Sequence, residues 1–376
     1  MRYYVISGEQ SGDMHASNLV AELKKKDCNA EIRAWGGDKL KEQGVQIVKH
    51  IKDLDFMGFW EVIVNLPTIL SNISFCKKDI LAFFPDALIL VDYPGFNFRI
   101  AEFAKQNGIK VFYYISPQIW AWKRNRIKQI KKNVDKMFVI LPFEKDFYQK
   151  NNFEVDFVGH PLLDEISKDD FSFSIKTDKD IIALLPGSRR QEISKILPKM
   201  LSVVNDFTDF QFVVATTNSV EEEYYKNIIG TKEVLFAKNE TYGLLANTKA
   251  ALVTSGTATL EAALFGIPQV VCYKTNFFSF LIAKCLVKTK FISLVNIIMD
   301  KPVVKELIQD ELIQKNLFSS LSEILENSNR KKIQEDYNIL KVKLGVEGAS
   351  EKVAEIILHT LLKDKKSILS DSAFKD

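Results

Sequence analysis

The chain has 376 residues, more than a single hydrophobic core usually organises, so its length predicts two domains. Hydrophobic residues make up 47% of it and charged residues 26%, and 51 Lys and Arg against 48 Asp and Glu leave a net charge of only +3. That composition is ordinary for a globular protein, and so small a positive excess argues against a nucleic-acid partner.

The cysteines and the apolar stretches narrow the class of protein further. Four cysteines lie far apart without a CxxC pair, which indicates reduced packing residues in a cytosolic protein and predicts neither a disulfide framework nor a zinc site. The amino terminus runs directly into a glycine loop, so no signal peptide is expected. The uncharged stretch Val62–Cys76 is interrupted by Asn and Pro and is shorter than the ~20 apolar residues of a membrane span, so we expect no transmembrane helix.

The first half of the chain alternates short apolar runs with helical patterns. It begins with a predicted strand at Tyr3–Ile6, a loop at Ser7–Gly12 and an amphipathic helix at His15–Lys26. Further strands are predicted at Glu31–Trp35, Ala87–Val91, Lys110–Ile115, Met137–Leu141 and Asp156–Val158. Alternation of β-branched runs with helices is typical of a parallel, doubly wound sheet.

The polar segment Ser167–Asp180 shows no sustained periodicity and is predicted to be a linker. After it a helix is predicted from about Glu192, and strands are predicted at Ile181–Leu185, Gln211–Ala215, Glu233–Phe236, Ala250–Val253 and Gln269–Cys272. From Leu317 to about Leu362 the pattern is helical, with breaks at Gly345 and Gly348. The expected fold is therefore α/β, with two Rossmann-like doubly wound domains that face a central cleft. Their expected boundaries are residues 1–165, a linker at 166–180, residues 181–345, and a helix over 346–376 that packs back toward the first domain and ends in a frayed tail.

The most informative loop follows a predicted strand of the second half and opens a helix. It comprises Ser255, Gly256, Thr257, Ala258, Thr259 and Glu261. Its small residues leave room for an anion, which backbone N–H groups, hydroxyls and the helix dipole would bind. Glu261, one turn further on, would accept hydrogen bonds from two ribose hydroxyls. The alternative is an ordinary N-cap, in which Ser or Thr satisfies the first amides of the helix.

A second loop of this half, Gly187, Ser188 and Arg189, also follows a strand and offers free amides in a tight turn. The Arg189 guanidinium would neutralise the charge that builds up on a diphosphate leaving group, unless the loop is only a solvated basic turn. Asp53–Asp55 and Asp178–Asp180 fit a DxD pattern, but both precede strands. We interpret them as solvated charge and predict no metal site and no cofactor.

In the first half, the loop after the first strand contains Gly8, Glu9, Ser11, Gly12 and Asp13. It departs from GxGxxG, which disfavours a dinucleotide fingerprint, and its two carboxylates would repel a pyrophosphate. These residues are therefore predicted to bind a hydroxylated acceptor. The alternative is a glycine turn with Asp13 near a helix start.

Asp92 follows the strongly apolar strand Ala87–Val91, and Asn97 lies in the same loop. Apolar neighbours would raise the pKa of this carboxyl and suit it to general-base catalysis. The alternative is an Asx-turn cap before Pro94.

Ser116 and Trp120 follow the next strand and precede a basic run. Aromatic residues followed by cations suit a ligand that is both phosphorylated and apolar. The alternative is that the tryptophans form a buried pair beside an exposed basic helix. His160 precedes the linker, where it either lines the cleft or serves as a structural turn histidine.

With these loops assembled, the chain resembles the lipid-A-disaccharide synthases, a family of inverting, metal-independent glycosyltransferases of GT-B architecture. The motifs occur in the family's order along nearly the whole chain: SGEQSGD (7–13), MG with the following WEV (57–62), DYPGFN (92–97), SPQIWAW (116–122), LPFEKDFY (141–148), FVGHPL (157–162), LPGSRRQEI (185–193), TSGTATLE (254–261) and VKTKFISLVNII (287–298).

The resemblance implies a reaction. UDP-2,3-diacylglucosamine donates its sugar to the 6-hydroxyl of 2,3-diacylglucosamine 1-phosphate, giving lipid A disaccharide 1-phosphate and UDP in lipopolysaccharide biosynthesis. Asp92 then matches the family's base, and Arg189 and 255–261 match its UDP site. Asn296 falls in a matching cleft motif, and Met57 joins the acceptor side. Gly95 stands where the family commonly carries a second carboxylate, which weakens a two-carboxylate mechanism.

Because both substrates carry acyl chains, the apolar stretches Phe56–Cys76 and Phe277–Lys290 are expected either to reach the bilayer surface or to be core helices. The resemblance places the protein in the cytoplasm, peripherally on the inner membrane, and a homodimer is among the partners considered. Two rival functions stay open. One is a UDP-sugar 2-epimerase, which needs no lipid surface, and the other is a non-catalytic sugar- or lipid-binding protein, which leaves Asp92 and Arg189 without a task.

Overall fold

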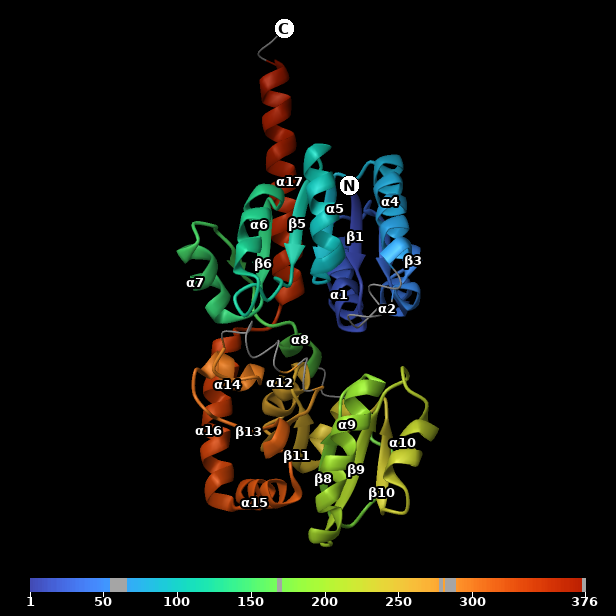
Figure 1. Cartoon of the computed structure of the whole chain (residues 1–376). Coiled ribbons are helices and arrows are strands. Elements are labelled where there is room, and N and C mark those ends of the chain that lie inside the picture. Colours follow the sequence, from blue (N-terminus) through green and yellow to red (C-terminus); the bar gives the residue numbers. More distant parts are fainter. Residues whose placement is uncertain (55–65, 168–170, 277–279, 281–288, 374–376) are drawn as a thin grey trace. The chain divides into compact units, whose positions relative to one another are not determined.

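The computed structural model describes residues 1–54, 66–167, 171–276, 280 and 289–373. Its contacts divide the chain into two compact units, one formed by Met1–Pro161 with Gly345–Asp376 and the other by Leu162–Leu344. Each unit contains a parallel sheet with helices on both of its faces (Figure 1). The predicted α/β, doubly wound fold is confirmed.

In the described part of the first unit, seven strands form one parallel sheet in the order β3-β2-β1-β4-β5-β6-β7. The strands are β1 (Arg2–Ser7), β2 (Glu31–Gly36), β3 (Gln46–His50), β4 (Ala87–Val91), β5 (Lys110–Tyr114), β6 (Lys136–Val139) and β7 (Asp156–Phe157). The chain winds outward in one direction from β1 and in the other from β4. The switch point therefore lies between these two strands, and ligands of open α/β sheets bind at the strand ends there.

Both faces of this sheet are covered, which explains why its central strands are almost wholly apolar. Tyr4 and Ile6 pack on one face under α4, α5 and α6, whereas Tyr3 and Val5 pack on the other under α1 and α17. The helices of the unit are α1 (Gln10–Lys26), α2 (Asp38–Glu42), α4 (Leu66–Phe83), α5 (Pro94–Gln106), α6 (Ile127–Asn133), α7 (Pro142–Lys150) and α17 (Ala349–Ala373).

The second unit repeats this plan with six described strands, all parallel, in the order β10-β9-β8-β11-β12-β13. They are β8 (Asp180–Leu185), β9 (Phe210–Thr216), β10 (Val234–Lys238), β11 (Thr248–Thr254), β12 (Gln269–Tyr273) and β13 (Lys305–Ile308). The helices are α8 (Leu162–Ile166), α9 (Arg190–Met200), α10 (Glu222–Ile229), α11 (Thr241–Ala246), α12 (Thr257–Leu264), α14 (Leu294–Met299), α15 (Gln314–Leu325) and α16 (Asn327–Leu344). Here the switch point lies between β8 and β11.

The structure differs from the sequence-based expectation at the start of α1. The segment Ser7–Gly12 was predicted to be a loop, but the helix begins at Gln10, with Glu9 as its extended N-cap residue. A Cβ atom at Gly12 would lie 3.4 Å from the Ser7 Cβ. This is an ordinary van der Waals distance, so Gly12 lies within the first turn of the helix and does not mark a loop.

Two edge strands, β3 and β13, were not predicted. β3 is polar and only half-buried, and β13 is only four residues long, so neither shows the apolar run that marks the central strands. The predicted helix breaks at Gly345 and Gly348 are confirmed, because both residues have left-handed backbone angles (φ 96° and 90°). α17 stays helical through Ala373, where a frayed tail was expected.

The polar segment predicted to be a linker is anchored to the second unit. Ser174 donates from its backbone N and its Oγ to Glu240 Oε2 at 3.0 and 2.9 Å. The Phe171 ring lies 5.4 Å from the ring of Tyr242. A Cβ at Gly243 would lie 2.0 Å from the Ser172 carbonyl oxygen, so this close approach needs a glycine.

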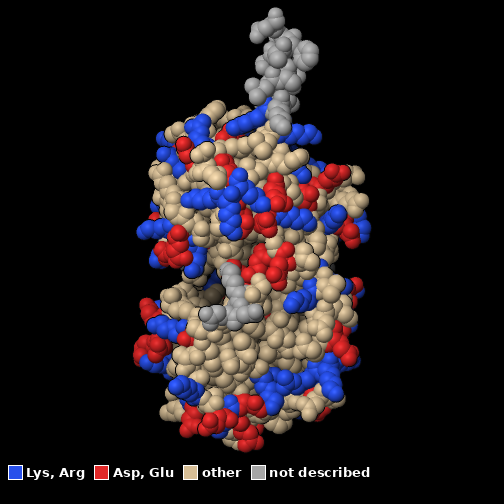
Figure 2. Space-filling model, turned by 180° about the vertical axis from the view of Figure 1, so that it is seen from behind, with Lys and Arg blue, Asp and Glu red and all other residues tan. Residues whose placement is uncertain are grey.

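Lys and Arg side chains are interspersed with Asp and Glu on the face seen in Figure 2, in line with the small net charge of the chain. Among the described residues, no helix combines the length and the apolar character needed to cross a bilayer.

Candidate functional site

The loop after β4 holds Asp92 in a strained turn at the switch point of the first sheet. Asp92 and Tyr93 both have left-handed backbone angles (φ 46° and 48°), which cost a non-glycine residue about 1–3 kcal/mol each. The Asp92 carbonyl accepts hydrogen bonds from Asn97 Nδ2 at 2.7 Å and from the Tyr113 hydroxyl at 2.6 Å. These two side chains, from α5 and β5, fix the backbone that carries the Asp92 carboxyl.

The Asp92 carboxyl is suited to exchange a proton near neutral pH. Burial and, to a smaller extent, the charge of Glu9 raise its pKa to about 7, against the opposing effect of a hydrogen bond from the Tyr93 backbone N–H. Glu9 comes close because the loop after β1 packs on Tyr93. A Cβ at Gly8 would lie 2.3 Å from the Tyr93 Cγ, so only glycine allows this approach. A carboxyl with a pKa near the working pH meets a main requirement of a general base.

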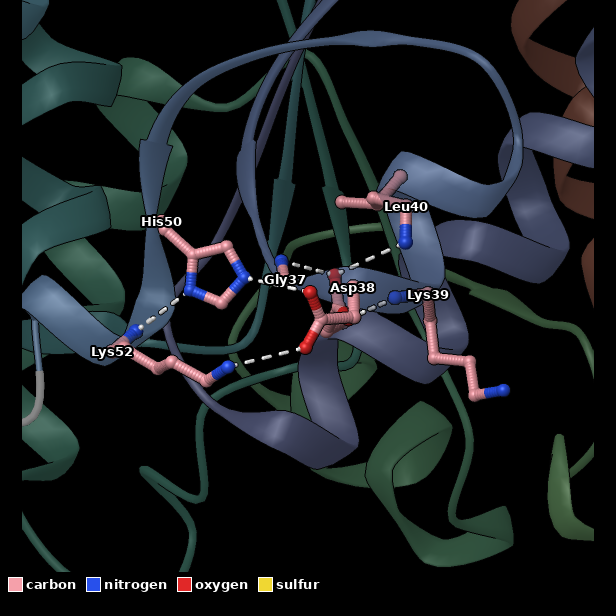
Figure 3. A network of polar contacts seen from close by, with 7 residues as sticks. Gly37, Asp38, Lys39, Leu40, His50 and Lys52 are labelled. Carbon is pink, nitrogen blue, oxygen red and sulfur yellow. Dashed lines mark hydrogen bonds and ion pairs between the residues drawn. The ribbon is translucent and has the colours of Figure 1, made fainter.

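Asp13, predicted to bind the acceptor, is instead occupied by the protein. It is 3% exposed, and its carboxylate accepts the backbone N–H groups of Gly37, Lys39 and Leu40 at 2.5, 3.0 and 3.4 Å. These three donors appear in Figure 3, beside the surface ion pairs of Asp38. Asp13 therefore caps the start of α2, and its contact with the acceptor stays a prediction.

Among the other residues of this loop, Ser11 is exposed on the first turn of α1, Glu9 is half-buried, and Gly12 packs against the strand. Contact of Glu9 and Ser11 with an acceptor stays a prediction. Met57 lies outside the described residues.

Ser116 and Trp120 also turn into the protein. The Ser116 Oγ is 2.7 Å from the Tyr148 hydroxyl, and Trp120 Nε1 donates to Glu144 Oε1 at 3.1 Å. Glu144 is 1% exposed, and burial raises its pKa to about 7. Their polar atoms hold the loop after β5 onto α7, and ligand contact by either residue stays a prediction.

His160 is 3% exposed in the core of the first unit. Burial and, to a smaller extent, neighbouring His15 lower its pKa to about 3, so the ring is neutral at ordinary pH. This environment corresponds to the structural turn histidine that was the alternative interpretation of His160.

In the second unit, the loop between β8 and α9 presents a cation at the start of a helix. Gly187 has a left-handed backbone angle (φ 107°), and a Cβ there would lie 2.5 Å from Glu192 Oε2. Ser188 and Arg189 are exposed, and Arg189 is the N-cap residue of α9, with its Nη1 3.6 Å from Glu192 Oε1. An exposed guanidinium at the start of an 11-residue helix suits an anion.

The loop between β11 and α12 lies on the other side of the same switch point. Gly256 is the N-cap residue of α12, with φ 145°, and Thr257 is exposed. Ser255 Oγ donates to the Ile292 carbonyl at 3.0 Å. Thr259 is fully buried and its Oγ1 donates to the Gly256 carbonyl at 2.8 Å, so this hydroxyl tightens the turn, and its contact with UDP stays a prediction.

Glu261 lies one turn into α12, next to the half-buried Ala258. Burial outweighs the opposing effect of a hydrogen bond from the Tyr242 hydroxyl, at 3.3 Å, and raises the pKa of Glu261 to about 7. Tyr242 was not singled out from the sequence. Its ring packs against Phe171 of the supposed linker, a contact that no local pattern announces.

Both polar atoms of the Asn296 amide have hydrogen-bond partners within the protein. It is 1% exposed, its Nδ2 donates to the Val304 carbonyl and to Glu306 Oε1, both at 2.9 Å, and its Oδ1 accepts the Val304 N–H at 2.9 Å. Asn296 therefore supports this segment, and its contact with UDP stays a prediction. Glu306 was also missed, and the only local signal was a lone carboxylate within the apolar run Val303–Ile308.

Within the described ranges, no group of three or more His, Cys, Asp or Glu side chains is arranged to hold a metal ion. The candidate site therefore consists of two clusters, each at the switch point of its own sheet. The cluster in the first unit presents the half-buried carboxyl of Asp92. The cluster in the second unit presents the starts of α9 and α12 with the Arg189 guanidinium.

Comparison with known proteins gives a consistent family assignment. Residues 3–360 match the family model described as lipid-A-disaccharide synthetase. A lipid-A-disaccharide synthase of Syntrophus aciditrophicus is 40% identical over 96% of this chain and 97% of its own length. Those of Geobacter sulfurreducens and Coxiella burnetii are 34% and 35% identical, over 96% and 95% of this chain and 98% of their own lengths.

Solved structures resemble the chain in fold alone. A UDP-GlcNAc 2-epimerase of Neisseria meningitidis, bound to UDP-GlcNAc, has a TM-score of 0.67 at 16% identity, covering 96% of this chain and 100% of its own. The calicheamicin glycosyltransferase CalG4 has a TM-score of 0.63 at 14% identity, covering 96% and 99%. Both the epimerases and the glycosyltransferases therefore share the two-domain GT-B architecture with this chain.

Proposed function

The chain belongs to the lipid-A-disaccharide synthase family of glycosyltransferases, and from that premise we propose how its residues divide the work of the transfer. The reaction joins UDP-2,3-diacylglucosamine to 2,3-diacylglucosamine 1-phosphate, giving the lipid A disaccharide 1-phosphate and UDP. The epimerases among the structural neighbours are 16% identical or less, a likeness that extends to fold alone.

Asp92 is the general base of this proposal. Its carboxylate takes the proton from the 6-hydroxyl of the acceptor as that oxygen attacks the anomeric carbon of the donor. The bond from this carbon to the diphosphate breaks on the opposite face, UDP leaves, and the configuration inverts. The observation that carries the assignment is the pinned turn, in which Asn97 and Tyr113 hold the Asp92 backbone while burial raises its pKa to about 7.

The second unit binds the leaving group in this proposal. Backbone amides at the starts of α9 and α12, with the exposed Arg189, stabilise the charge that develops on the diphosphate. Glu261, when ionised, accepts hydrogen bonds from the ribose hydroxyls. Gly187, Ser188, Gly256, Thr257 and Ala258 shape the backbone on which the anion rests.

The substitution Asp92→Asn tests the base. It keeps the size of the side chain and removes its basicity, so we expect kcat to fall about 10²–10⁴-fold with little change in UDP affinity. Turnover is measured as UDP release that depends on both acylated glucosamines, and affinity by calorimetry.

Asp86→Asn is the matched control, because Asp86 lies just before β4 and its carboxylate accepts the Arg2 N–H at 2.8 Å, away from the carboxyl end of the strand. This variant is expected to keep near-normal turnover. Near-normal turnover of Asp92→Asn would remove Asp92 from the mechanism.

We further propose that the first unit meets its acylated substrates at the cytoplasmic surface of the inner membrane. Only Ile73, Cys76 and Ile80 of α4 are buried, whereas Leu66 and Leu70 are 47% and 53% exposed. The basic helix α6 covers the same face of the sheet as α4, since both contribute to one core. Apolar and cationic groups on the same face support binding to an anionic bilayer surface.

A further inference from the structure

Glu306 organises a hydrogen-bond network next to the start of α12. It lies in the edge strand β13, opposite Val271 of β12. Its Oε1 accepts from the Ser293 N–H at 2.9 Å, the Ser293 Oγ at 2.7 Å and Asn296 Nδ2 at 2.9 Å, and its Oε2 accepts from the Ile292 N–H at 3.0 Å. A single half-buried carboxylate thus receives four donors from one short segment, 292–296.

This segment in turn holds Ser255. The Ile292 carbonyl accepts the hydrogen bond from Ser255 Oγ at 3.0 Å, while the N–H of the same residue donates to Glu306. Ser293 is fully buried and caps α14, and its Oγ accepts the Asn296 N–H at 3.3 Å. The position of the Ile292 carbonyl, and with it the Ser255 hydroxyl, therefore depends on the Glu306 carboxylate.

Glu306 is unsuited to bind the nucleotide directly. Its two oxygens are occupied by protein donors, and a carboxylate would repel a diphosphate. Charge-assisted hydrogen bonds from backbone amides are, however, among the strongest that a protein forms, which suits the group to fixing a loop.

We propose that Glu306 is a positioning residue for diphosphate binding, acting through Ile292 and Ser255 to hold the β11–α12 turn in its anion-binding conformation. The inference rests on the proposed function of the second unit. It assigns Glu306 and Ser293 an effect on UDP affinity, with no contact to UDP.

A double-mutant cycle on UDP binding tests this coupling. Ser255→Ala is expected to weaken UDP binding about tenfold, and Glu306→Gln about five- to tenfold, because the glutamine amide turns an N–H toward donors that need an acceptor. If both act through one path, the double variant binds no more than about twofold more weakly than the worse single variant. Independent effects would instead multiply to about 50- to 100-fold.

Asp336→Asn is the matched control. Asp336 is a half-buried carboxylate of the same unit, paired with Lys301 and without a hydrogen bond to 292–296 among the described contacts. Its loss is expected to change UDP affinity less than twofold, whatever it does to thermal stability. Ser293→Ala provides a second variant should Glu306→Gln not fold, and a two- to threefold weakening is expected because one of the donors to Glu306 is lost.

The outcomes separate the two levels of the proposal. If Ser255→Ala leaves UDP affinity unchanged, the anion site at α12 itself is wrong. If Ser255→Ala weakens binding but Glu306→Gln and Ser293→Ala do not, or if the effects of Ser255→Ala and Glu306→Gln multiply, the positioning role of Glu306 is overturned while the site stands.

Discussion

The turn at Asp92 shows how strain and hydrogen bonding combine at one residue. Left-handed angles at Asp92 and Tyr93 oppose folding, and the hydrogen bonds from Asn97 and Tyr113 to the Asp92 carbonyl offset that cost. The backbone at Asp92 therefore leaves β4 in a turn and does not continue along the usual extended path. Such an arrangement is expected where the position of a side chain matters more than the stability of the fold.

The raised pKa of Asp92 predicts the pH dependence of turnover. A general base works only when it is deprotonated, so kcat/KM should fall about tenfold per pH unit below a pKa of about 7 and level off above it. Glu9→Gln removes a negative charge that favours the protonated form, so the pKa of Asp92 should fall and the acid limb should move to lower pH.

The pH–rate profiles of both forms check this. Glu102→Gln, which alters an exposed carboxylate on α5, is the control and should leave the limb in place. If the acid limb of Glu9→Gln lies at the same pH as before or at higher pH, the assigned coupling between Glu9 and Asp92 is contradicted.

At the scale of single elements, α4 carries the membrane proposal. Its outward residues Leu66 and Leu70 are one helical turn apart, so they present one apolar stripe. Replacing both by Glu should reduce co-sedimentation with anionic liposomes about tenfold or more, because two leucines lose an apolar environment and two charges are repelled by the lipid.

Val342→Glu supplies the comparison, because Val342 is 80% exposed on α16 of the second unit and lies outside the proposed surface. Its liposome binding should match that of the unchanged chain. Equal binding by the α4 variant would exclude this helix as the contact.

Most elements could be predicted from local pattern, and the exceptions have physical causes. The buried central strands, such as Ala87–Val91, carry unbroken apolar runs because helices cover both of their faces. The edge strands β3 and β13 have a neighbour on one side only and keep polar residues, so their pattern resembles that of a loop. Because β13 was not predicted, its residue Glu306 was not identified from the sequence.

At the scale of the whole molecule, the chain returns to its first unit at the end. Ile357 of α17 is fully buried in the core that also contains Leu19 of α1. Ile357→Ala should therefore destabilise the first unit by about 2–5 kcal/mol, while UDP affinity stays unchanged because the nucleotide is assigned to the second unit.

Chemical unfolding followed together with UDP binding checks this division. Ile339→Ala makes the same replacement at a site that is 48% exposed on α16, and it should cost far less stability. A loss of UDP affinity in Ile357→Ala under conditions where the chain is folded would contradict independent roles for the two units. The homodimer considered from the resemblance stays a prediction.

The amino-acid sequence by itself determined the repeated β–α alternation, the position of the candidate loops directly after strands, and the family. These follow from local periodicity and from motif order, which need no knowledge of distant contacts. Only the tertiary structure decided which polar side chains remain open to a ligand. Asp13, Ser116 and Asn296 find their hydrogen-bond partners in segments that no local pattern connects to them. Asp92 keeps its carboxyl half-buried at the strand end, because Asn97 and Tyr113 bind its carbonyl instead.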